Sequence, residues 1–164
     1  ALLMVLTRCI SASDAREAVD WQTLIGIGAS FALGKALAKS GAAKLLAEIV
    51  VGQLGGLGPV AVLAGVYLVT LVITELISNN AAAAVVFPLA VATAAELGVS
   101  PRPFVIAVMF AASCAFATPI GYQTHMMVWG PGGYRFADFL RVGIPLNLLI
   151  WVVVVALAPF FWPF

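Results

Sequence analysis

Long stretches without a charged residue are the feature that most constrains this chain. Four segments that contain no Asp, Glu, Lys or Arg cover residues 49–74, 76–95, 103–134 and 142–164. A helix that crosses the hydrocarbon core of a bilayer needs about 20 predominantly apolar residues, and each segment is about that long or longer. Over the whole chain 63% of the residues are apolar and only 9% are charged, against about a quarter charged in a typical soluble domain. We therefore predict an all-α, multi-pass integral membrane protein.

Charge and cysteine content argue against several other classes of protein. The formal net charge is +1, and the chain lacks the basic cluster with which proteins bind nucleic acid. Cys9 and Cys114 lie far apart without metal-ligand spacing, so we interpret both as small packing residues. The sequence shows no nucleophile with a base, no paired carboxylates and no metal-binding motif, so we do not expect an enzyme. Because the chain begins inside an apolar run without Met, we interpret it as a fragment of a longer protein.

The first third of the chain predicts helices around a polar loop. Residues 1–10 are typical of the end of a spanning helix, residues 11–20 form a polar loop, and residues 21–37 predict the next spanning helix. Residues 42–54 place Lys44 and Glu48 on one face, so this segment is expected to lie along the membrane interface.

A polar interruption lies between two apolar arms in the middle of the chain. Residues 60–77 and 81–95 both predict helices, and Ser78, Asn79 and Asn80 separate them. Two arms of about this length, with hydrogen-bonding side chains between them, suit a re-entrant hairpin whose tip stops inside the membrane. We place this hairpin at about residues 59–95.

A second interruption follows at Thr118-Pro119-Ile120-Gly121. Residues 104–117 predict a helix, but Pro119 removes a backbone donor and Gly121 frees the backbone. The chain should continue as a helix over residues 122–129, which gives a broken transmembrane helix at about residues 103–129. The last helix is predicted at about residues 139–160.

Interrupted helices can bind both an anion and a cation. The arm that begins at Ala81 presents free backbone N–H groups, and the dipole of a helix favours negative charge at that end. Sodium could be coordinated by oxygens from the residues Ser78 to Asn80, by Thr118 and by carbonyls around Pro119. Neutral oxygens are sufficient for a monovalent cation.

Five short motifs resemble those of one transporter family. They are Val-Asp-Trp at 19–21, Thr-Glu-Leu-Ile-Ser-Asn-Asn-Ala at 74–81, Phe-Pro at 87–88, Ala-Thr-Pro-Ile-Gly-Tyr-Gln-Thr at 117–124 and Trp-Gly-Pro-Gly-Gly-Tyr at 129–134. On these residues the chain resembles the divalent anion:sodium symporter family of the ion-transporter superfamily, and the last motif is similar to its sulfate-transporter-like branch. The resemblance covers nearly the whole chain. It implies that residues 1–164 are a single transmembrane domain, the C-terminal half of a longer transporter and the second of two inverted repeats.

In that family a hairpin tip in each repeat binds both substrate and sodium. The resemblance therefore implies symport of a small divalent anion, sulfate or a di- or tricarboxylate, with sodium as the coupling ion. The substrate-binding residues that it implies are Ser78, Asn79, Asn80, Thr118, Pro119 and Thr124, and the sodium ligands are Ser78, Asn79, Thr118 and Gly121. The partners that we expect are the lipid bilayer, the missing N-terminal repeat and a second copy in a homodimer. The expected location is the inner membrane of a bacterium.

Other interpretations stay open. One is proton-coupled transport or antiport in the same superfamily, with Glu75 or His125 as the proton carrier. Another is an inert structural membrane fragment. At single positions, Glu75 could be a carboxylate satisfied by a neighbouring helix, and His125 a hydrogen-bonded structural residue. The two interruptions could be an ordinary helix N-cap at residues 78–80 and a proline kink at residues 118–119.

Overall fold

The computed structural model describes the chain from Lys39 onward and some of the residues before it. The residues described are Met4, Thr7, residues 9–17, Ile25, Ala32, Ala36 and residues 39–164. The spanning helices predicted at residues 1–10 and 21–37 lie for the most part outside them. In the segment predicted to be a polar loop, residues 11–20, the structure instead has a short helix, α2, at Ala12–Glu17.

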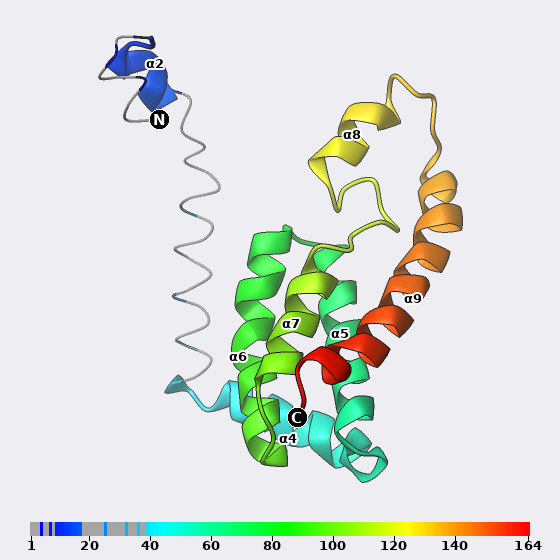
Figure 1. Cartoon of the computed structure of the whole chain (residues 1–164). Helices are drawn as coiled ribbons and strands as arrows, with labels where there is room; N and C mark the ends of the chain where they lie inside the picture. Colours follow the sequence, from blue (N-terminus) through cyan, green and yellow to red (C-terminus); the bar gives the residue numbers. More distant parts are fainter. Residues whose placement is uncertain are drawn as a thin grey trace.

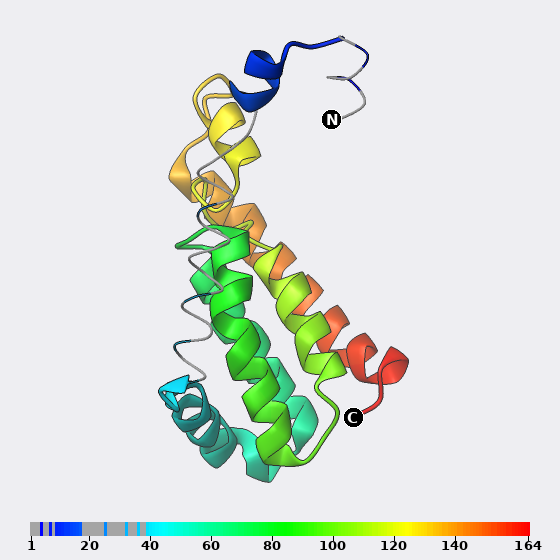
Figure 2. The ribbon, with the colours of Figure 1, turned by 90° about the vertical axis from the view of Figure 1, so that its left-hand side faces the viewer.

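Within the described residues the secondary structure is entirely helical. After α2 the order is α4 (Ala42–Leu54), the 3-10 helix η1 (Gly55–Leu57), α5 (Pro59–Thr74), α6 (Asn79–Leu97), α7 (Arg102–Ala112), α8 (Gln123–Trp129) and α9 (Phe136–Phe161). Helices α5, α6 and α7 lie side by side, and α9 slants along them (Figure 1). Helix α4 lies across the end of this group, where the chain enters α5 (Figure 2). The prediction of an all-α protein is therefore confirmed.

Two of the described helices, α6 and α9, are long and apolar enough to cross a membrane. They have 19 and 26 residues, which correspond to lengths of about 29 and 39 Å at about 1.5 Å per residue. Helix α9 begins three residues before the predicted start at residue 139. The reason is local, because the Asp138 carboxylate accepts a hydrogen bond from the backbone N–H of Arg135 at 2.8 Å and caps the first turn.

The α5–α6 pair differs in detail from the predicted arms. Helix α5 starts at Pro59, directly after Gly58 at φ 91°, and ends at Thr74, three residues earlier than predicted. Residues 75–78 form the turn. Ser78 is the N-cap of α6, and its Oγ accepts a hydrogen bond from the Ala81 N–H at 3.4 Å. Asn79 and Asn80 are therefore in the first turn of α6 and not between the helices, because Ser78 starts the helix.

The second interruption is longer than predicted. Helix α7 ends at Ala112, five residues before the predicted end at residue 117. Residues 113–122 are non-helical, and they include Thr118, Pro119 and Gly121. Helix α8 then runs to Trp129.

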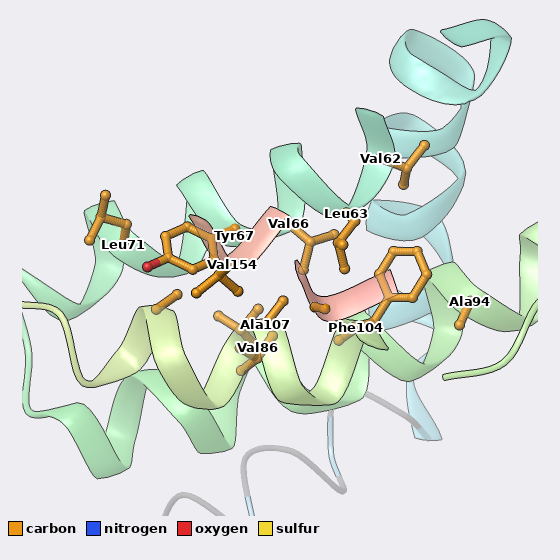
Figure 3. Packing of buried hydrophobic residues seen from close by; sticks show 14 of the residues in the cluster. Val62, Leu63, Val66, Tyr67, Leu71, Val86, Ala94, Phe104, Ala107 and Val154 are labelled. Carbon is orange, nitrogen blue, oxygen red and sulfur yellow. The ribbon is translucent and has the colours of Figure 1, made fainter. Parts of the chain in front are cut away.

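The apolar core lies between α5, α6, α7 and the second half of α9. Its largest fully buried side chains include Leu63, Tyr67 and Phe104, and Val154 contributes from α9 (Figure 3). Small residues such as Ala107 let the helices approach closely, which is the usual way that helices pack in a membrane. This core holds the ends of α5 and α7 at fixed positions, and the polar residues described next lie at those ends.

Candidate functional site

The turn of the α5–α6 hairpin is hydrogen-bonded to the non-helical segment after α7. The backbone N–H groups of Ala117 and Thr118 donate to the Glu75 carboxylate, to Oε1 at 2.8 Å and to Oε2 at 2.9 Å. In the opposite direction, Thr118 Oγ1 donates to the backbone carbonyl of Glu75 at 3.1 Å. The two bonds to the carboxylate join residues that are 42 and 43 positions apart in the sequence. Two distant segments of the chain therefore meet at one place.

Helix α9 contributes a third donor to the same carboxylate. Asn147 Nδ2 donates to Glu75 Oε1 at 2.9 Å, and both side chains are buried, with 4% of Asn147 and 8% of Glu75 exposed. A carboxylate with three N–H donors has its hydrogen-bonding capacity well used without a bound cation. These contacts favour the interpretation of Glu75 as a carboxylate satisfied by its neighbours.

Asn79 is linked to the end of α7 through Thr74. The Thr74 hydroxyl lies 3.0 Å from Asn79 Oδ1 and 2.7 Å from the carbonyl oxygen of Ala112, and it can donate to either. Asn79 is half-buried, whereas Ser78 and Asn80 are exposed. Of the three predicted tip residues, Asn79 is therefore the one whose side chain lies within hydrogen-bonding distance of α5 across the turn.

The segment at residues 118–125 folds back on Thr118. Gly121 N–H donates to Thr118 Oγ1 at 3.1 Å, and His125 Nδ1 lies 3.1 Å from the Thr118 carbonyl oxygen. A Cβ at residue 121 would lie 2.7 Å from the Cβ of Ala115, so the turn has room only for glycine. Pro119 is buried in this turn.

His125 lies among aromatic rings at the start of α8. Its ring centroid is 5.7 Å from that of Tyr122 and 5.4 Å from that of Phe139. Thr124, the remaining predicted site residue, is exposed on α8, and its side chain makes no hydrogen bond to the described part of the chain. The structure thus brings together Asn79, Thr118 and Gly121 around the turn, while the Thr124 side chain takes no part in these hydrogen bonds.

Two residues of α9, Gly143 and Asn147, were missed by the sequence reasoning. Asn147 bonds to Glu75, and Gly143 packs so closely on the backbone of Phe116 and Ala117 that a Cβ there would lie 2.6 Å from Ala117 Cα. A signal was present, because an Asn and a Gly four residues apart share one face of an otherwise apolar helix.

A pocket of about 410 Å³ lies beside this junction, between α8 and α9. It is lined mainly by apolar and aromatic side chains, including Phe116, Val142 and Leu146, and also by Asp138 and His125. A mainly apolar lining offers few hydrogen bonds in place of the water around a small divalent anion. This pocket is therefore a poor site for such an anion.

The site offers neutral oxygens and backbone N–H groups. In the ranges that the structure describes, no group of three or more His, Cys, Asp or Glu side chains could hold a metal ion. Hydroxyl, amide and carbonyl oxygens suit a hard monovalent cation, and a helix N-terminus suits an anion. Apolar helices and a polar break of this kind are typical of membrane transporters.

Comparison with known proteins identifies the class and then the family. Residues 1–108 match the model of the citrate transporter family. The chain is 39% identical over 149 residues to an uncharacterized transporter of Synechocystis, with 91% of this chain and 24% of the relative covered. It is 37% identical over 163 residues to an uncharacterized transporter of Escherichia coli, covering 99% of this chain and 27% of that protein. It is 35% identical over 159 residues to sodium/sulfate cotransporter 1 of Chlamydomonas reinhardtii, covering 95% of this chain and 18% of that protein.

These matches are to a family of membrane transporters. The chain belongs to the citrate transporter family, and the resemblance to the divalent anion:sodium symporters is confirmed. It spans about a quarter or less of the length of these relatives.

Proposed function

We propose that the full-length protein is a sodium-coupled symporter of a small divalent anion, sulfate or a di- or tricarboxylate. The observation that carries the proposal is the hydrogen-bonded contact between the hairpin turn at Glu75 and the non-helical segment at Thr118. It gathers a helix N-terminus and several neutral oxygens at one end of the helices. The sodium/sulfate cotransporter relative and the citrate transporter family both support a small anion as the substrate.

The anion would lie at the N-terminus of α6. The first N–H groups of a helix have no partner within the helix, and the dipole adds partial positive charge there. Ser78 Oγ accepts from one of these groups, that of Ala81. The N–H groups and side chains of Asn79 and Asn80 would be available to the substrate, with Thr118, Pro119 and Thr124 completing this half of the site.

Sodium would lie between the turn and the non-helical segment. The proposed ligands are oxygens of Ser78, Asn79, Thr118 and Gly121, and Asn79 and Thr118 lie on the two sides of the contact made by Glu75. In this proposal α5 and α6 are a re-entrant hairpin, and α7 and α8 are the two parts of a broken helix. The chain is one inverted repeat, and the other repeat supplies the matching half of the site. A homodimer in a bacterial inner membrane is part of the same proposal.

The experiment is uptake into vesicles that contain the purified full-length protein. Radiolabelled sulfate and succinate are supplied with a sodium gradient, with a proton gradient, and with neither. We expect uptake of one of the anions to require sodium. Uptake that follows the proton gradient and does not depend on sodium would favour the proton-coupled alternative over sodium symport. No uptake under any gradient would favour an inert protein.

A further inference from the structure

The junction between the hairpin turn, the non-helical segment and α9 carries one further inference. We infer that Gly143 and Asn147 of α9 are positioning residues that set the relative placement of the two sides of the proposed binding site. The inference rests on the proposed function for its effect on transport, but its structural part can be tested without transport. None of the predicted site residues lies on α9.

Gly143 brings α9 into contact with the segment that carries Thr118. A Cβ at residue 143 would overlap the backbone carbonyl of Phe116 and lie 2.6 Å from Ala117 Cα. These atoms belong to the backbone, so they cannot move aside as the end of a flexible side chain could. Glycine at residue 143 therefore allows α9 to lie directly on residues 116–117, next to the amide of Thr118.

Asn147 lies one helical turn further on and contacts the other side of the junction. Its Nδ2 donates to Glu75 Oε1, while its Oδ1 is buried and has no hydrogen-bond partner among the described residues. A buried carbonyl oxygen without a partner is destabilising. An apolar side chain would avoid that cost, so packing alone does not explain an Asn at this position. Its hydrogen bond to Glu75 does.

The contacts form a continuous path from α9 to both sides of the proposed site. Asn147 and the backbone of Ala117 bond to the same oxygen, Oε1 of Glu75. The other carboxylate oxygen accepts from the backbone of Thr118, whose hydroxyl returns to the Glu75 carbonyl. Helix α9 therefore holds Glu75, four residues before Asn79, and Thr118 in one arrangement. A binding site needs its ligands within about 0.5 Å of their productive positions.

The first test measures the junction itself by hydrogen–deuterium exchange of the full-length protein. The variant Asn147→Leu removes the donor and replaces it with an apolar side chain of similar size. We expect faster exchange in peptides that cover residues 75–78 and 113–122, because without the Asn147 donor Glu75 is held less firmly as the acceptor of the Ala117 and Thr118 N–H groups. The control is Leu149→Ala on the exposed side of α9. Unchanged exchange in Asn147→Leu overturns the inference whatever the protein transports.

The second test separates positioning from general stability. In vesicles, Asn147→Leu should raise the concentration of the coupling ion that gives half-maximal uptake by about tenfold, the value of one lost hydrogen bond to a charged group. The amount of protein and the melting temperature in detergent should match those of Leu149→Ala. A fall in melting temperature and protein amount with an unchanged half-saturation concentration would assign Asn147 a structural role only.

A double variant that reverses the donor and acceptor at residues 147 and 75 tests whether their hydrogen bond can be restored. Asn147→Asp alone places two carboxylates against each other, so it should be the most impaired variant. In the double variant Glu75→Gln/Asn147→Asp the Gln amide can donate to Asp, which restores one hydrogen bond between these positions. We expect the double variant to have a lower half-saturation concentration than Asn147→Asp alone. A double variant that is equally impaired or worse would contradict the inferred pairing. If the unmutated protein shows no coupled uptake, the proposed function fails. The hydrogen–deuterium exchange of Asn147→Leu still decides the inference.

Discussion

Asn147 of α9 donates a hydrogen bond from its side-chain amide to the carboxylate of Glu75, 72 residues earlier in the chain. The same carboxylate accepts hydrogen bonds from the backbone of Ala117 and Thr118. Glu75 therefore joins three parts of the chain that local sequence patterns treat as separate: the hairpin turn, the non-helical segment after α7, and the last helix.

Replacing Glu75 by Gln should weaken the junction. A Gln side chain has one oxygen where Glu75 has two, so its NH₂ group must face at least one of the N–H donors. A buried donor left without an acceptor costs about 1–3 kcal/mol. We expect a lower melting temperature of the full-length protein in detergent and slower sodium-driven uptake. The matched control is Glu96→Gln at the exposed end of α6, and equal behaviour of the two variants would contradict the role given to Glu75.

Replacing Asn79 by Ala should abolish sodium-dependent anion uptake and leave membrane insertion intact. The amide can supply an oxygen to the cation and a donor to the anion, and a methyl group supplies neither. Loss of a hydrogen bond to a charged group costs about 1.5–3 kcal/mol, which is roughly tenfold or more in affinity. Radiolabelled uptake with and without a sodium gradient measures the effect. The control is Thr93→Val on the same helix, where the lost bond is only to the Leu89 carbonyl. Normal transport by Asn79→Ala would show that Asn79 has only a structural role.

Replacing Gly143 by Ala should separate α9 from the backbone at residues 116–117. The added methyl group has no space, and extra volume in a packed site costs about 1–3 kcal/mol. Thermal unfolding in detergent should show a lower melting temperature. Gly52→Ala in α4 is the matched control, because a Cβ there meets no atom within 4 Å, and it should be neutral or slightly stabilising. A melting temperature of Gly143→Ala at or above that of the control would show that the contact is not tight.

Replacing His125 by Phe should leave the pH dependence of uptake unchanged. The Phe ring keeps the packing with Tyr122 and Phe139 and removes the Nδ1 contact with the Thr118 carbonyl. In the proposed sodium symporter His125 does not transfer a proton across the membrane, so the ratio of uptake with and without sodium should persist between about pH 5 and 8. Loss of coupling in this variant, together with a flattened pH profile, would favour the proton-coupled alternative.

Much of the helical architecture follows from the sequence. Uncharged stretches predicted the helices that became α5, α6 and α9, because apolar length decides whether a helix can be buried in lipid. The sequence also indicated the two interruptions, since Ser78 caps α6 and the segment that contains Pro119 and Gly121 is non-helical. The resemblance to a transporter family rested on the same residues, and the comparisons confirmed it.

The tertiary structure decided what these local patterns could not. Residues 113–116 have an apolar composition that predicts continued helix, yet the chain is non-helical there, and the amides that follow donate to Glu75 instead of to an α-helical turn. Asn147 gives no local indication that its partner is a carboxylate on another helix. The physical reason is that helix propensity and apolar periodicity act over a few residues, whereas a buried carboxylate must take donors from whichever segments the fold brings to it.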